Sequence, residues 1–123
     1  MGNFVTAEAR AATRDLFARE DRPDAVFVAN DHMAFAVMDV LRFDLGLSVP
    51  EDVSVVGYDD VPPASWAAYD LTTVRQRANL MVERTVELLL TQIETPESPV
   101  QAVAIEAPLI LRGSARIPQG WTP

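Results

Sequence analysis

The fold is decided by the stretch Val53-Ser54-Val55-Val56-Gly57-Tyr58-Asp59-Asp60. Its first residues form a short apolar run rich in β-branched side chains, which is typical of a buried strand. The run ends abruptly in two carboxylates. A second run of the same kind covers residues 25–29 and stops at Asn30-Asp31. The sequence therefore predicts two buried strands, each followed by polar residues.

Helical stretches surround these strands. Thr6 is a potential N-cap for a helix over residues 7–19, and Asn30 or Asp31 is expected to cap a helix over residues 32–45. Gly46 suits the left-handed position that follows a helix. A third helix is predicted over residues 79–95. Extended segments are expected at residues 71–74, 100–107 and 109–111, the last two joined at Pro108. Alternating helices and strands indicate an α/β fold, a parallel sheet with flanking helices.

Composition narrows the class of protein. The chain has 123 residues, 49% of them hydrophobic, which suits a single soluble domain. The chain has ten Arg, no Lys and 18 acidic residues. The resulting net charge of −8 disfavours direct contact with DNA or an anionic membrane. No apolar run is long enough for a membrane span. With no cysteine, thiolate metal sites and disulfides are excluded, and a reducing cytoplasm is compatible.

The polar residues after the strands predict a binding site. Ligands of open α/β sheets lie beyond the carboxyl ends of the strands, where Asn30-Asp31 and Asp59-Asp60 are expected. At each position the alternative is structural, a helix cap or a turn residue. Catalysis is less supported, because no lysine is present for phosphoryl transfer, no phosphate-binding or serine-elbow motif occurs, and His32 is the sole histidine. We therefore expect binding, with no enzymatic activity, metal or cofactor.

Three ordered segments carry a family resemblance. They are Pro23-Asp24-Ala25-Val26-Phe27-Val28-Ala29-Asn30-Asp31-His32-Met33-Ala34, then Val49-Pro50-Glu51-Asp52 leading into Val53–Asp60, then Leu71-Thr72-Thr73-Val74-Arg75-Gln76. Together they closely resemble the lactose/galactose-repressor family of bacterial transcription regulators. The resemblance extends over nearly the whole chain and implies part of a periplasmic-binding-protein-like (type I) effector domain.

The resemblance also implies how the chain is organised. Residues 1–113 correspond to the C-terminal portion of the effector-binding and dimerisation domain, within which residues 76–107 would belong with an N-terminal subdomain, and residues 114–123 form a tail. Met1 would then start in mid-domain. The DNA-binding helix-turn-helix of this family is not visible here, so contact with DNA would depend on a missing N-terminal domain. The apolar residues of the helix at 79–95 would lose the cover of that subdomain.

Ligand contacts follow from the same resemblance. Asp59 matches a carboxylate that binds ligand hydroxyls or ring nitrogens, and Asn30 or Asp31 matches a polar contact. Gln76 is a third candidate. Phe4 matches an aromatic residue that lies against the ligand, although the following Thr6-Ala7-Glu8-Ala9 departs from the usual small-residue turn. The implied effector is a small molecule, a sugar or a purine-like compound.

A homodimer is the other implied partnership. The resemblance assigns a dimer surface to the helix from His32 and to the loop at residues 62–69, and the helix is apolar nearly all round. The predicted interface residues are Met33, Phe35, Val37, Trp66 and Tyr69. The alternative is a helix buried within a larger monomer.

The expected function is the ligand-sensing part of a cytoplasmic transcription regulator. Two alternatives remain: a fragment of a periplasmic solute-binding protein of a transporter, which shares the architecture, and an oligomerisation fragment without a competent pocket. The sequence preceding Met1 would separate the first two, because one requires a helix-turn-helix and the other an export signal.

Overall fold

A computed structural model describes residues 5–122, and its contacts divide the chain into two units. Unit 1 contains residues up to Arg75 together with Leu109 onward, and unit 2 is Gln76–Pro108. Within the described residues, no helix has the length and apolar character needed to cross a membrane.

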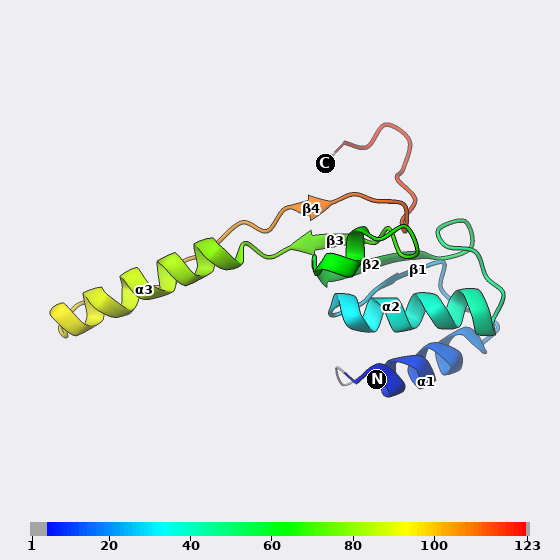
Figure 1. Ribbon diagram of the computed structural model, residues 1–123, viewed down its shortest axis with the longest axis horizontal. Coiled ribbons are helices and arrows are strands. Elements are labelled where there is room, and N and C mark those ends of the chain that lie inside the picture. The colour runs from blue at the N-terminus through cyan, green and yellow to red at the C-terminus, as the bar shows by residue number, and fades with distance from the viewer. Residues whose placement is uncertain (1–4, 123) are drawn as a thin grey trace. The chain divides into compact units, whose positions relative to one another are not determined.

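Unit 1 is built on a four-stranded sheet in the order β1-β2-β3-β4 (Figure 1). The strands are β1 (Ala25–Phe27), β2 (Ser54–Asp59), β3 (Thr72–Arg75) and β4 (Leu109–Ile110). The first three are parallel, with Phe27 opposite Val56, and β4 is antiparallel to β3. The predicted α/β class is confirmed, and the antiparallel edge is a feature that the sequence did not reveal.

Two helices cover one face of this sheet (Figure 1). They are α1 (Thr6–Phe17) and α2 (Asp31–Asp39), and the latter continues as a π-helical turn, η1 (Val40–Asp44). Asn30 is the N-cap of α2, as one of the two predicted alternatives had it, and Gly46 has a left-handed φ of 64°. Thr6 is not a cap, because it is already the first helical residue, and Val5 before it provides no side-chain hydrogen bond.

The core lies between α2 and the sheet. Met38, Leu41, Val53, Val55 and Leu71 are all at most 1% exposed. Burying each side chain of this size stabilises the folded chain by roughly 1.5–3 kcal/mol. Apolar runs in the sequence therefore mark the strands of this core. A short 3-10 helix, η2 (Pro62–Ser65), follows β2 and covers the end of this core with the buried Ala64.

The first residues of the predicted tail form hydrogen bonds with two strands of the sheet. Ser114 is completely buried, its hydroxyl donates to the Val55 carbonyl at 2.6 Å, and it accepts from the Thr72 amide at 2.8 Å. Arg116 adds a hydrogen bond from its backbone amide to the Ser54 hydroxyl. Residues 114–116 therefore bridge β2 and β3 after the chain has returned from β4.

Unit 2 consists of α3 (Ala78–Glu94) and a returning segment without regular structure. None of the α3 residues is buried in the described chain, and Val82, Leu89 and Ile93 are each about 60% exposed. The strand predicted at residues 100–107 is wrong. Its β-branched composition is suitable, but a strand requires a hydrogen-bonded neighbour, and in the described residues this segment pairs with none.

Candidate functional site

The predicted ligand residues lie along one edge of the sheet in unit 1. Because β1, β2 and β3 are parallel, their carboxyl ends meet at the same edge. Asn30 and Asp31 follow β1, Asp59 ends β2, and Arg75 ends β3 directly opposite Asp59 in the register. The structure therefore gathers the polar ends of three strands at the place that the sequence indicated.

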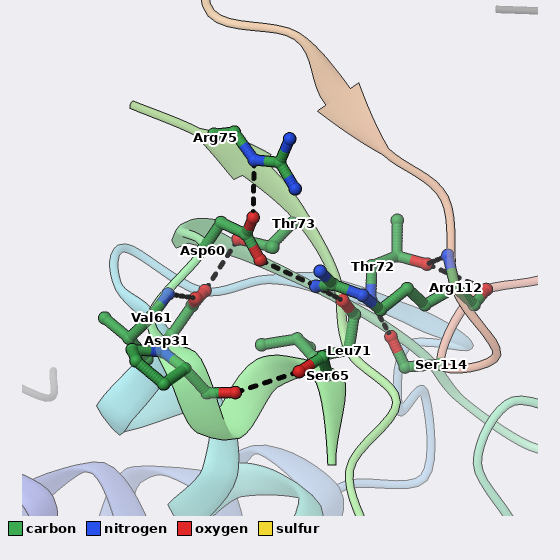
Figure 2. A network of polar contacts seen from close by, with 11 residues as sticks. Asp31, Asp60, Val61, Ser65, Leu71, Thr72, Thr73, Arg75, Arg112 and Ser114 are labelled. Atoms are coloured by element: carbon green, nitrogen blue, oxygen red, sulfur yellow. Dashed lines mark hydrogen bonds and ion pairs between the residues drawn. The ribbon is translucent and has the colours of Figure 1, made fainter. Parts of the chain in front are cut away.

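Asp31 is fully buried and its carboxylate is committed to the fold. Its Oδ1 accepts from the Thr73 hydroxyl at 2.6 Å, and its Oδ2 accepts from the Val61 amide at 2.9 Å (Figure 2). The geometry thus gives Asp31 a structural role, in which it joins the start of α2 to β3 and to the loop after β2.

Asn30 is partly exposed and combines two capacities. Its Oδ1 accepts from the Met33 amide at 2.9 Å, which caps α2. A side-chain amide also carries an NH₂ group with two donors, so capping by the oxygen leaves donor capacity for a second partner. Asn30 can therefore cap the helix and still serve as a ligand contact.

Asp59 and Asp60 adopt unusual backbone conformations. Their φ angles are 128° and 62°, in the region that side-chain-bearing residues rarely occupy, although Asp is among the less disfavoured types. The Asp59 residue is partly exposed. This strained turn carries the chain from β2 into η2.

Asp60 is held by two arginines. Its Oδ2 accepts from Arg75 Nε at 2.7 Å, and its Oδ1 lies 2.8 Å from Arg112 Nη1 (Figure 2). Only 8% of the Asp60 side chain and 14% of the Arg112 side chain are exposed. Burial raises the pKa of Asp60, but the hydrogen bonds and positive charges of Arg112 and Arg75 outweigh it, so the pKa lies below its ordinary value. Asp60 is therefore ionised, and Arg75 and Arg112 balance its negative charge.

The sequence placed Asp60 in the predicted binding turn without giving it a ligand contact, and it gave no role to Arg112. The pair of carboxylates at 59–60 was visible, and Arg75 stands in one of the quoted motifs. Arg112 gave no signal, because it is separated from Asp60 by the whole of unit 2 and reaches it only after β4 has paired with β3.

Gln76 follows β3 as predicted and is partly exposed, at the first position of unit 2. Phe4 lies outside the described residues. The ligand-binding roles of Asn30, Asp31, Asp59, Gln76 and Phe4 stay predictions.

The predicted interface residues divide into two groups. Met33, Phe35 and Val37 are at most 9% exposed and pack into the core of this chain. Trp66 is 59% exposed. Tyr69 stacks on Phe35 with ring centroids 4.3 Å apart. The pKa of Tyr69 is raised, mainly because the side chain is partly buried and also because the Asp39 carboxylate is close to it. A dimer through this region stays a prediction, and Trp66 is the member that the described chain leaves most open to a partner.

Two further features bear on the chemistry. Within residues 5–122, no group of three or more His, Asp or Glu is placed to hold a metal ion. An apolar groove of about 330 Å³ lies between α1 and β1, with Leu16, Phe17 and Phe27 among its lining residues. None of the described ligand candidates lines this groove, so it is separate from the polar edge.

Comparison with known proteins places this geometry in context. Residues 1–115 match the model of a periplasmic binding protein-like domain. The chain is 38% identical over 114 residues to the ribose operon repressor of Escherichia coli K12, covering 93% of this chain and 34% of that protein. It is 35% identical over 115 residues to the HTH-type transcriptional repressor PurR of Vibrio vulnificus, with 94% and 34% coverage.

A solved structure shows the same relationship. The complex of the transcriptional regulator CelR with cellobiose superposes with a TM-score of 0.83 and 38% identity, over 93% of this chain and 35% of that one. The chain thus spans about a third of the length of the curated relatives it matches. These relatives are transcriptional repressors, in agreement with the prediction of a regulator rather than an enzyme.

Proposed function

We propose, from the premise that this chain belongs to the family of periplasmic-binding-protein-like domains, that it is the effector-sensing portion of a bacterial transcription regulator of the lactose/galactose-repressor type. The membership inferred from the three sequence motifs is confirmed by the match over residues 1–115. The sensing role of this portion is the further step.

One observation carries the proposal. At the carboxyl edge of the sheet, Asp31 and Asp60 are held by partners in the same chain, and Asp59, which directly precedes Asp60, is partly exposed. The contacts of Asp31 and Asp60 shape the turn, and the Asp59 carboxylate is exposed enough to accept hydrogen bonds from a ligand. This arrangement supports Asp59 as a recognition residue with Asn30 and Gln76 beside the neighbouring strand ends.

The chemistry of the site favours a small ligand with several hydroxyl or N–H donors. A carboxylate acts only as an acceptor, whereas amide side chains both donate and accept, a combination that suits a sugar or a purine-like compound. Among the relatives, one is named for a ribose operon and one is bound to cellobiose, which supports a sugar.

The wider roles rest on the longer relatives. We infer that the whole protein acts in the cytoplasm, forms a homodimer and binds DNA through a helix-turn-helix in a part not contained in this chain. The net charge of −8 supports the separation of DNA contact from this segment. Ligand binding would then alter DNA affinity by shifting the balance between two arrangements of the effector domain.

The test is calorimetry on the longer protein with ribose, cellobiose and hypoxanthine as probes. With the probe that binds, Asp59→Ala should raise the Kd roughly tenfold or more, since a hydrogen bond to a charged group contributes about 1.5–3 kcal/mol. The exposed Glu20→Gln serves as a matched carboxylate control and should leave the Kd unchanged. An Asp59→Ala protein with unaltered affinity would contradict the assignment.

A further inference from the structure

The chain passes between its two units at two points. It leaves unit 1 after Arg75, at the end of β3, and returns at Leu109, at the start of β4. Because β3 and β4 are antiparallel partners with Val74 opposite Leu109, the outgoing and returning segments leave unit 1 side by side. We call these two passages of the chain the crossings. A contact that holds both segments therefore fixes the places where the chain leaves and re-enters unit 1.

Asp60 makes such a contact, with one oxygen for each segment. Arg75 on the outgoing segment donates to Oδ2, and Arg112 on the returning segment approaches Oδ1 (Figure 2). Arg112 is fixed further, because its Nη1 donates to the Leu71 carbonyl at 2.9 Å and its backbone amide donates to the Thr72 hydroxyl at 2.9 Å. The Asp60 carboxylate therefore connects the turn at residues 59–60 to β3 and to the segment after β4.

The conformation of Asp60 is consistent with a residue placed for geometry. A positive φ is unfavourable for a residue with a side chain, so the surrounding contacts must hold it there. A largely buried ion pair is also weak evidence for added stability, because desolvation offsets much of the attraction, whereas it restricts the orientations of its members strongly.

We propose that Asp60 is a positioning residue that locks the turn carrying Asp59 to both crossings, so that the turn and the bases of the two crossings move as one body. Asp60 touches no ligand in this role. If Asp59 binds the effector, as proposed above, a displacement of the turn reaches both crossings through the neighbouring residue. The lock itself exists without ligand and is tested without it.

The experiment is amide hydrogen exchange on the full, unliganded chain, comparing the parental protein with Asp60→Asn. The substitution keeps the size of the side chain and removes its charge. We expect exchange to accelerate about tenfold or more in both residues 72–76 and residues 109–113, with little change in residues 34–38 of α2. The matched control is Asp44→Asn, which removes the exposed Arg14–Asp44 ion pair and should leave both crossing segments unchanged.

A merely structural role for Asp60 predicts a different pattern. If Asp60→Asn accelerated exchange in α2 by the same factor as in the crossings, the residue would stabilise unit 1 as a whole, and the proposal would be overturned. Unchanged exchange in either crossing segment would overturn it as well. Arg75→Gln provides an independent test, because Arg75 is half exposed and its loss should be tolerated by the fold.

For Arg75→Gln we expect acceleration in residues 72–76 that exceeds the acceleration in residues 109–113, since only the outgoing segment is released. Equal protection of residues 72–76 in this variant and in the parental chain would contradict the proposal even if Asp60→Asn did not fold. Failure of ligand binding at Asp59 would not alter any of these results, so the two proposals can fail separately.

Discussion

The Thr73 hydroxyl donates a 2.6 Å hydrogen bond to Asp31 Oδ1, joining residues that lie 42 positions apart in the chain. Both side chains are completely buried, and within the described residues no buried side-chain oxygen or nitrogen is left without a partner. The bond connects the first residue of α2 to the middle of β3. It fixes the helix whose start forms one side of the polar edge.

Removing this donor should destabilise unit 1. Thr73→Val preserves the shape of the side chain but leaves an oxygen of Asp31 without its hydroxyl partner, which we expect to cost about 1–3 kcal/mol of unfolding free energy. Urea unfolding measures the loss. Thr85→Val is the control, because the Thr85 hydroxyl donates to a carbonyl on the exposed helix α3, and its effect should stay below about 0.5 kcal/mol. Equal costs for the two variants would contradict the importance of the buried bond.

Gly57 is required for space rather than for conformation. A Cβ at this position would overlap Asp31 Oδ1 and lie 2.9 Å from a methyl carbon of Leu71. Gly57→Ala should therefore cost about 1–3 kcal/mol through overpacking and displace the Asp31 carboxylate. In a double-mutant cycle with Thr73→Val, the double variant should lose less than the sum of the single losses, because both changes disrupt the same bond. Additive losses would show that Gly57 and the bond are independent.

The Asp60 ion pairs should make the thermal stability of the chain decrease at low pH. The pKa of Asp60 in the folded chain lies below its ordinary value of 3.8, so the unfolded chain binds this proton more readily. The stabilisation is complete above the ordinary pKa and is lost as the pH falls through the folded pKa. Between about pH 6 and about pH 3, we expect the Tm of Asp60→Asn to decline less than that of the parental chain.

Thermal unfolding followed by circular dichroism provides the measurement. Asp44→Asn, at the exposed ion pair with Arg14, is again the matched control, and its Tm should follow the parental curve within a small offset. Parallel curves for Asp60→Asn and the parental chain would mean that the ion pairs with Arg75 and Arg112 contribute no acid dependence.

The sequence predicted the parts of the fold that depend on local pattern. The run around Val55 is apolar because β2 is largely buried. The burial predicted for the run around Val26 is wrong, because β1 is largely exposed in the described residues and Phe27 is 66% exposed. Asn30 caps α2 because its side chain suits that position. The antiparallel pairing of β4 was not predictable from its short apolar segment, since pairing direction depends on where a partner strand lies. The same reason explains the wrong strand at residues 100–107, whose composition favours a strand but whose backbone has no neighbour.

The candidate site shows the same division. Position after a strand was enough to place Asp59 and Asn30 at the same edge of the sheet, because parallel strands bring their carboxyl ends together. The burial of Asp31 could not be predicted, because its two partners, Thr73 and Val61, come from other elements. Arg112 was missed for a related reason, since its contact with Asp60 exists only once the chain has returned through β4.

The pairing of β3 with β4 has a practical consequence. With Val74 opposite Leu109, residues 76–108 are in topological terms an insertion into the loop of a β-hairpin. Replacing them with Asn-Gly would leave a three-residue hairpin loop, Arg75-Asn-Gly, which keeps Val74 opposite Leu109. The same point could accept an unrelated folded module whose termini lie close together. The crossings are thus a natural graft point for building a chimaeric sensor.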